Sequence, residues 1–338
     1  MAILKQPRQI ADISRMFSNR QITQAHYREK VVGNNRVVAV WKRDNVTAKV
    51  CVEGVNELSR ICTPQVYKPF LGVNASKNLD ALAYMLQRRN LEREKDRSST
   101  YKFSFQLVEY AKVRGYSEED VSRGGKFIEN LQKDLCMGAN TSYELKDFTI
   151  YDTERENHNL PSFYTLNPPK AKKGKWQVIF SEPYRYDYMN PKPYYPIAAD
   201  CIADKGKKGY LYFFMREIIR SCNHPGRIKV QTLLNYVNIP RKTLARPKES
   251  FRLLCEGIYY TGRVWKPLKE VVFSALKDGL VKAVEPITVK EFKGFSYSRM
   301  QKILRKLEVV DVRDVSVTFC NSRRKAQELK EVRAVVVE

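Results

Sequence analysis

The segment YLYFFMREIIRSCNHPGRIKVQTLLNYV, residues 210–237, decides how the chain is expected to fold. Apolar residues recur at three- and four-residue intervals across 211–222, which predicts a helix with one apolar face. The NHPG run at 223–226 favours a turn, because proline and glycine interrupt a helix. Apolar positions across 230–237 then predict a short second helix. Two helices joined by a turn are therefore expected here.

Two further helices and a strand are predicted downstream. Pro247 is placed to open a third helix, and Pro267 to open a fourth that ends at Gly279. Residues 280–284 are rich in β-branched side chains and predict a strand. Helices that lead into a last amphipathic helix and a hairpin are typical of a winged helix, which places its last helix in the DNA major groove. Residues 267–278 are therefore expected to form the recognition helix.

The outward side of this expected helix carries candidate DNA contacts. Its basic side chains are expected to meet phosphates, and Ser274 is expected to contact a base edge. The candidates in this domain are Arg263, Lys266, Lys269, Ser274, Lys277 and Lys282. A solvated surface helix would show the same lysine-rich face, so that alternative stays open.

A later helix, 296–307, is also expected to be amphipathic. Its apolar residues fall on one side, and its basic residues fall on the other. The outward residues are Arg299, Lys302, Arg305 and Lys306. We expect this helix to leave a basic face beside the wing.

The charge balance points to a polyanionic partner. The 338 residues include 61 Lys and Arg against 37 Asp and Glu, a formal net charge of +24. Basic residues that replace condensed counterions on a nucleic acid gain free energy from counterion release. An anionic membrane is a weaker interpretation, because no basic amphipathic helix with a Trp or Phe face is visible. We expect double-stranded DNA as the partner and no membrane.

Composition excludes several other classes. A hydrophobic content of 43% predicts folded domains, and the length allows two cores. No apolar run approaches the ~18 residues of a membrane span, and the first residues lack a signal-peptide pattern. Seven scattered cysteines and three dispersed histidines indicate neither a disulfide framework nor a metal site. We expect a soluble, cytoplasmic protein without metal or cofactor.

The region ahead of residue 183 shows a similar order of elements. Helices are predicted near 79–86 and 104–115, and Ser117 and Asp120 resemble a capping box that opens a helix ending near Leu135. Strands follow at 143–151 and 176–180. Its candidate DNA contacts are Arg123, Lys126, Asn130 and Lys133 on the helix, and Lys170, Lys172, Lys173 and Lys175 on a wing tip. The lysine-rich stretch also fits a disordered surface loop.

These patterns predict an α+β fold with two tandem winged-helix domains. The expected parts are an N-terminal extension with a β-hairpin (1–70), winged-helix domain 1 (71–182), a Pro/Tyr-rich connector (183–208) and winged-helix domain 2 with a C-terminal helix (209–338). The connector's tyrosines are expected to pack against neighbouring domains, with stacking on exposed bases as the alternative.

Enzyme motifs are mostly absent. The chain has no Gly-x-x-x-x-Gly-Lys-[Ser/Thr] motif and no His-x-His pair, which argues against nucleotide hydrolysis and metal-dependent nicking. His224 and Arg227 fit the spacing of tyrosine recombinases, with Tyr259 or Tyr260 as the nucleophile. Tyr259 falls on the apolar side of its predicted helix, so we expect a protein that is not an enzyme. A strand-transfer enzyme remains the alternative.

Three stretches resemble a known family. LVEYAKVRG at 107–115, IKVQTLL at 228–234 and the segment 267–279 are similar to the two winged-helix domains of theta-type plasmid replication initiators. The resemblance implies a protein that binds iteron repeats at an origin, opens AT-rich DNA and recruits the host replicative helicase or its loader. It also implies repression of its own gene as a homodimer. A winged-helix transcriptional regulator is the alternative with the same fold.

Overall fold

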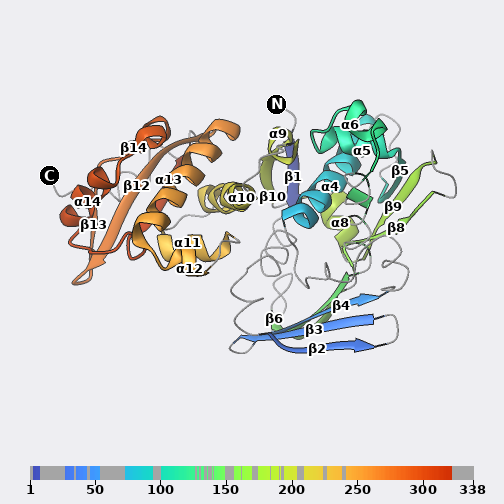
Figure 1. The fold of residues 1–338 in the computed structure, drawn as a ribbon, viewed down its shortest axis with the longest axis horizontal. Helices are drawn as coiled ribbons and strands as arrows, with labels where there is room; N and C mark the ends of the chain where they lie inside the picture. Colours follow the sequence, from blue (N-terminus) through green and yellow to red (C-terminus); the bar gives the residue numbers. More distant parts are fainter. Residues whose placement is uncertain are drawn as a thin grey trace. The chain divides into compact units, whose positions relative to one another are not determined.

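The chain has an α+β fold and divides into two compact units, residues 1–205 and 206–338 (Figure 1). The structure is a computed structural model. It describes residues 3–7, 27–33, 36–43, 46–53, 73–93, 100–125, 128, 131, 132, 135, 139, 141–148, 156–160, 162–169, 174–182, 184–189, 191, 194–203, 209–223, 227–237 and 241–321. Each unit is described by itself.

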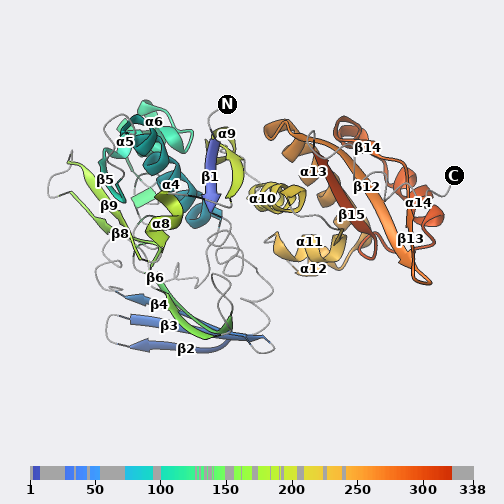
Figure 2. The same ribbon diagram turned by 180° about the vertical axis from the view of Figure 1, so that it is seen from behind.

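The second unit joins helices to a five-stranded sheet. Its helices are α10 (Tyr210–Asn223), α11 (Val230–Tyr236), α12 (Arg241–Leu244), α13 (Pro247–Val264), the 3₁₀ helix η3 (Val289–Gly294) and α14 (Tyr297–Lys306). Its strands are β11 (Ile228–Lys229), β12 (Leu268–Lys277), β13 (Leu280–Ala283), β14 (Ile287–Thr288) and β15 (Ser316–Asn321). The sheet runs β11-β15-β12-β13, and β14 also pairs with β12. Figure 2 brings β15 into view beside β12.

The helices predicted around the opening segment are confirmed. Helix α10 buries its apolar side against α13, which begins at Pro247 as expected. Gly257 allows this close approach, because a Cβ there would lie 2.5 Å from the ring of Phe214 on α10. Helix α14 likewise turns Met300, Ile303 and Leu304 inward.

The expected recognition helix at 267–278 is wrong, because these residues form strand β12. Residues 271–275 are all buried, so the strand lacks the alternation that normally identifies one. Its continuous apolar run therefore also matched helical spacing. Asp278 and Gly279 have φ of 50° and 76°, and they join β12 to β13 in a two-residue turn that requires positive φ at both positions. The helix that precedes this hairpin is α13.

The first unit repeats this order of elements. Helix α4 (Val73–Arg93) precedes strand β5 (Lys102–Phe105), and helices α5 (Leu107–Val113) and α6 (Glu118–Ser122) follow it. Strands β8 (Tyr164–Asn167) and β9 (Trp176–Phe180) come later in the chain. The sheet order β5-β9-β8 matches β11-β15-β12, since in each the last strand lies between the other two. In both units a longer helix is followed by a short strand and two short helices, and strands later in the chain complete the sheet.

One predicted helix of the first unit is divided. The Ser117 capping box is confirmed, but α6 ends at Ser122. Gly124 and Gly125 follow with φ of 64° and 72°, a left-handed conformation that ends a right-handed helix. Ile128, Leu131 and Leu135 again have helical backbone, and Leu131 and Leu135 are buried as expected.

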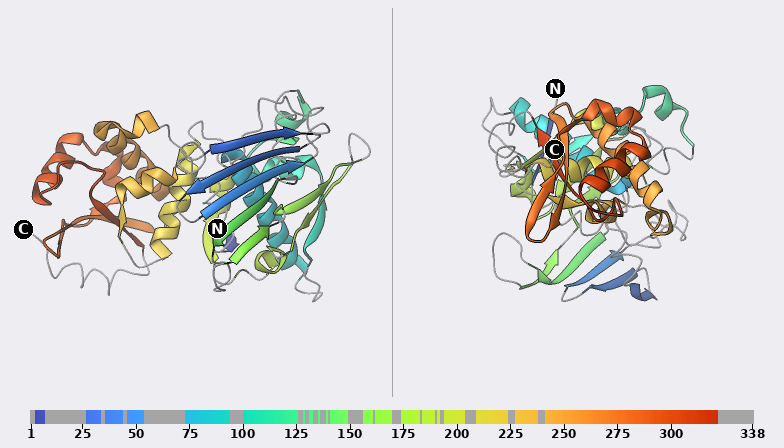
Figure 3. Two further views of the ribbon diagram at one scale, coloured as in Figure 1. Left: turned by 90° about the horizontal axis from the view of Figure 1, so that it is seen from below. Right: turned by 90° about the vertical axis from the view of Figure 1, so that its left-hand side faces the viewer.

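The N-terminal hairpin belongs to an inserted sheet. Strands β2 (Tyr27–Gly33), β3 (Arg36–Arg43) and β4 (Val46–Glu53) pair with β6 (Thr141–Phe148) and β7 (Glu156–Leu160) in the order β2-β3-β4-β6-β7. Figure 3 shows its strands running side by side. The hairpin of residues 1–70 is therefore part of the first unit rather than a separate extension.

The Pro/Tyr-rich segment is largely folded. It contains α8 (Tyr184–Met189), β10 (Tyr194–Ala198) and α9 (Ala199–Ala203), and β10 pairs with β1 (Ile3–Pro7). Tyr184, Tyr188 and Tyr195 are buried, and the first two contact the rings of Phe163 and Phe180 within the first unit. Packing of these tyrosines against a neighbouring domain stays a prediction. The segment lies within the first unit, which extends to residue 205. The expected C-terminal helix lies beyond residue 321, outside the described residues.

Candidate nucleic-acid interface

Helix α13 presents a narrow exposed stripe with little net charge. Arg252, at its centre, donates hydrogen bonds of 3.0 Å from Nε to Glu249 and from Nη1 to Glu256. The bond to Glu249 is the main cause of the raised pKa of the Arg252 guanidinium. Lys248 and Arg263 are the other exposed cations of the stripe. Because two carboxylates offset three cations, α13 is a weak candidate for the main phosphate-binding helix.

Helix α14 is far more basic on its outer side. Ser296 caps its first turn by accepting a hydrogen bond of 3.2 Å from the Arg299 N–H. The helix contains no acidic residue, and its exposed cations are Arg299, Lys302, Arg305 and Lys306. Arg299 Nη2 lies 2.6 Å from Glu291 Oε2 on η3. Within the described part of the chain the other three cations have no ion pair, so they are available to a polyanion.

The β12–β13 hairpin is tied to the end of this helix. Ala275 pairs with Lys282, and Lys277 pairs with Leu280, so both lysines point to the same face. Both lysines form ion pairs with Glu308, which follows α14. Glu308 has φ of 56° and closes the helix in a left-handed conformation. The two elements lie together in Figure 1.

We name the resulting cationic area the wing–α14 surface. It consists of Lys277, Lys282, Lys302, Arg305 and Lys306. Glu308 offsets part of the charge of the two hairpin lysines. The remaining charge lies on one exposed helix, where phosphates are able to approach without displacing an internal ion pair.

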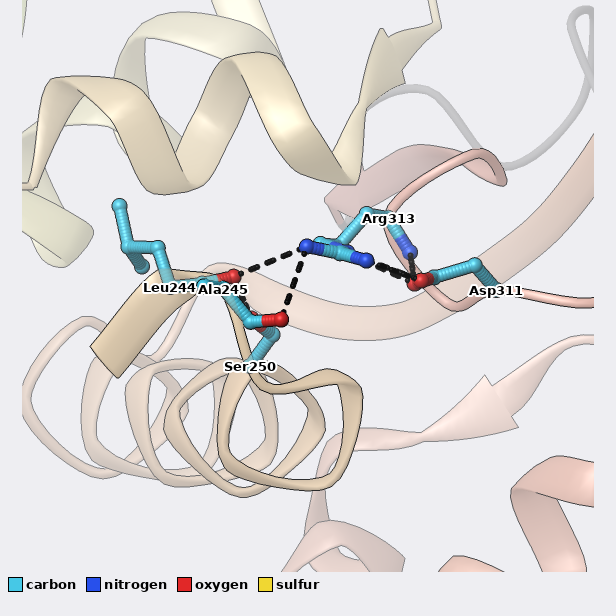
Figure 4. A network of polar contacts seen from close by, with 5 residues as sticks. All are labelled: Leu244, Ala245, Ser250, Asp311 and Arg313. Carbon is cyan, nitrogen blue, oxygen red and sulfur yellow. Dashed lines mark hydrogen bonds and ion pairs between the residues drawn. The ribbon is translucent and has the colours of Figure 1, made fainter. Parts of the chain in front are cut away.

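An arginine fixes the loop ahead of β15 to the end of α12 (Figure 4). Arg313 Nε lies 3.0 Å from both carboxylate oxygens of Asp311, and its Nη1 donates to the carbonyls of Leu244 at 3.2 Å and Ala245 at 3.3 Å. Ser250 Oγ donates to the same Leu244 carbonyl at 3.1 Å. The bond from Arg313 holds the pKa of the Asp311 carboxyl below its usual range. This network fixes the segment after α14 relative to α13.

The candidate residues predicted around 263–282 do not form one row. Lys269 and Lys277 lie eight residues apart on a strand, a separation of roughly 27 Å. Arg263 and Lys266 are exposed near the Lys269 end, where the Arg263 guanidinium lies 5.6 Å from the Tyr260 ring centre. Only Lys277 and Lys282 lie beside α14.

Ser274, predicted to read a base, is turned into the protein. It is 1% exposed, and its Oγ has no hydrogen-bond partner among the described residues. The expectation failed because Ser274 was placed on a helix. On a strand its side chain shares a face with that of Ala283 across the ladder. Ser274 is therefore not presented to DNA.

Two of the candidates in the first unit are described. Arg123 is exposed and lies 3.9 Å from Glu119, and Lys175 is exposed immediately before β9. Strand β9 follows the lysine-rich stretch as expected, but its hairpin partner is β8, whereas the strand expected at 143–151 corresponds to β6, which pairs with β4 and β7. The remaining candidates, Lys126, Asn130, Lys133, Lys170, Lys172 and Lys173, lie outside the described residues.

The structure places the groups considered for a strand-transfer enzyme in different environments. Tyr260 is buried and Tyr259 is half-buried, whereas Arg227 is exposed and His224 lies outside the described residues. No group of three or more His, Cys, Asp or Glu side chains is placed to hold a metal ion in the described ranges. None of the described helices is long and apolar enough to cross a membrane.

Fold and surface together define an α+β protein with two helix-and-hairpin units and a cationic helix on the second. No model of a known protein family matches the chain, and no curated protein matches its sequence. Among solved structures, the chain is similar to the crystal structure of selenomethionine derivatives of domains 2 and 3 of RctB. The two share 10% identity with a TM-score of 0.44, over 80% of this chain and 95% of that chain. The assignment of an α+β fold rests on the helices and strand order described above.

Proposed function

We propose that this chain binds double-stranded DNA through the wing–α14 surface and acts as a plasmid replication initiator. The observation that carries the proposal is the outer face of α14, where Lys302, Arg305 and Lys306 are exposed beside the hairpin lysines. The formal net charge of +24 supports a polyanionic partner. The repeated strand order and the resemblance of the sequence to iteron-binding initiators support the initiator role.

In this proposal α14 lies against the duplex. Lys302 and Lys306 contact phosphates, while Arg305 and Gln301, exposed on the same outer side, read base edges. The hairpin lysines add phosphate contacts beside the end of the helix. The protein binds repeats at an origin, without cofactor or catalytic residue, and then recruits a replicative helicase or its loader.

The test uses the full chain and fluorescent duplex DNA. A triple variant, Lys302→Ala with Arg305→Ala and Lys306→Ala, should bind more weakly and lower the slope of log affinity against log salt by about 0.9 per lost phosphate contact. Arg227→Ala with Lys229→Ala is the control, because β11 and β13 lie at opposite edges of the sheet. An unchanged slope in the triple variant would remove α14 from the interface.

Footprinting on the DNA that flanks the gene tests the initiator role. Protection of direct tandem repeats, lost in the triple variant, is the expected result. Protection of a single inverted repeat at the promoter would instead indicate a transcriptional regulator. Equal affinity for repeat and unrelated duplexes would contradict both roles.

A further inference from the structure

A groove of about 690 Å³ lies beside α13 within the second unit. Helix α13 and the residue before it form one wall, and η3 and the start of α14 form the other. Phe251, Phe292 and Phe295 line its floor. The volume falls within the roughly 300–1,000 Å³ of sites that hold small ligands.

The floor is an apolar surface whose shape is fixed by packing. The rings of Phe292 and Phe295 stack with centres 5.1 Å apart, and Phe251 meets Tyr297 edge-on at 5.3 Å. Cys255 also lines the floor, and burial raises the pKa of its thiol to about 12, so it stays neutral. An occupant therefore meets a preformed, uncharged surface.

The walls and rim carry two other kinds of group. Tyr259 and Tyr297 line the groove from opposite walls and are only half-buried. Arg246, Lys248 and Lys293 are exposed cations around it, and they come from both walls. The two carboxylates that also line the groove are already bonded to Arg252. The rim is therefore positive above an aromatic interior.

We propose that this groove binds an unstacked base of single-stranded DNA, with the flanking phosphates on its rim. Aromatic side chains stack on any base, and cations beside them track the backbone. A base inside a duplex is already stacked and paired, so it cannot enter such a groove. The inference rests on the proposed function to this extent: a protein that opens an origin exposes single strands next to its duplex site.

The test measures binding of a fluorescein-labelled twelve-nucleotide oligo(dT) to the full chain. Tyr259→Leu with Tyr297→Leu removes both rings but keeps apolar side chains, and Tyr259→Phe with Tyr297→Phe keeps the rings. The leucine variant should bind oligo(dT) about tenfold or more weakly, and the phenylalanine variant should bind like the unchanged protein. Lys293→Ala, an exposed change that leaves the core intact, should lower the single-strand salt slope by about 0.7.

Four other results would contradict the proposal that the groove binds single-stranded DNA. Equal oligo(dT) binding by the leucine and phenylalanine variants, together with an unchanged slope in Lys293→Ala, overturns the proposal. Equal losses of duplex and oligo(dT) binding would make the groove part of the duplex surface. Tight binding of dTMP alone would identify a free-nucleotide site, and binding of an apolar peptide in place of oligo(dT) would identify a protein-docking site. The α14 triple variant tests duplex binding separately, so failure of one proposal is distinguishable from failure of the other.

Discussion

Tyr210, the first residue of α10, donates a 2.7 Å hydrogen bond to the carboxylate of Glu256 on α13. Burial, and secondarily this bond, raise the pKa of the tyrosine hydroxyl. The bond also continues the row of contacts from Glu256 to Arg252. It therefore fixes α10 against the exposed side of α13, next to the groove.

Replacing Tyr210 by phenylalanine should lower the free energy of unfolding by about 1–2 kcal/mol, since a partly buried hydrogen bond to a charged group is lost. A raised tyrosine pKa contributes stability that is present below the unfolded value near pH 10 and is lost as pH rises through the folded value. Urea unfolding should therefore show a constant difference from the unchanged protein between pH 6 and 9, and a smaller one above about pH 10. A difference that grows with pH would contradict this assignment.

Gly257 should not tolerate alanine. A Cβ there would lie 2.5 Å from ring carbons of Phe214, which is fixed in the core between α10 and α13. Gly257→Ala should destabilise the protein by about 1–3 kcal/mol through overpacking. Gly294→Ala is the matched control, because no atom lies within 4 Å of its added Cβ. Thermal unfolding that shifts equally in both variants would show that the α10–α13 contact is looser than described.

The Asp311–Arg313 ion pair should make the free energy of unfolding depend on pH in the acidic range. A carboxyl whose folded pKa is lowered contributes stability that is present above its ordinary value of 3.8 and is lost as pH falls through the folded value. Asp311→Asn should therefore cost about 1–2 kcal/mol at pH 6, and its difference from the unchanged protein should shrink below about pH 4. Urea unfolding from pH 3 to 7 measures this, and a difference independent of pH would exclude the ion pair as its cause.

Ser274→Ala should leave DNA affinity unchanged and should be neutral or stabilising. The buried Ser274 Oγ has no hydrogen-bond partner among the described residues, so its removal relieves a desolvation cost of about 1–3 kcal/mol. Chemical unfolding and duplex titration of the same variant measure the two effects. Weaker DNA binding with unchanged stability would restore Ser274 as a contact.

Ser274 was misplaced because strand β12 could not be recognised from the sequence alone. Helices α10, α11, α13 and α14 were predictable, because their apolar residues recur at three- and four-residue intervals with polar residues between them. Strand β12 is buried across 271–275, so its period is hidden, and only its partners in the sheet decide its structure. The sequence also did not predict that α8, β10 and α9 are folded. Strand β10 pairs with β1, which lies far away in the sequence, so no local pattern identifies it.

The basic character of the candidate site could be predicted from the sequence, but the contacts that bring its residues together could not. The basic side of α14 follows from its own periodicity, and the structure confirms it. No sequence pattern indicates that Glu308 pairs with Lys277 and Lys282, because the contact joins residues 26 and 31 positions apart. The groove beside α13 is likewise formed by two segments that are separate in the sequence.

Neutralising Glu308 should strengthen duplex binding. Its carboxylate pairs with both Lys277 and Lys282, so in Glu308→Gln these lysines become free to exchange that partner for phosphates. Glutamine keeps the length of the side chain and meets the same backbone restriction at φ of 56°. Salt titrations should show higher affinity and a slope steeper by up to about 0.9 for each lysine released.

Glu285→Gln, an exposed change of the same charge, is the control and should have a smaller effect. Weaker binding by Glu308→Gln would mean that the carboxylate is needed to hold the hairpin against the duplex, and identical effects of both changes would remove the hairpin lysines from the interface.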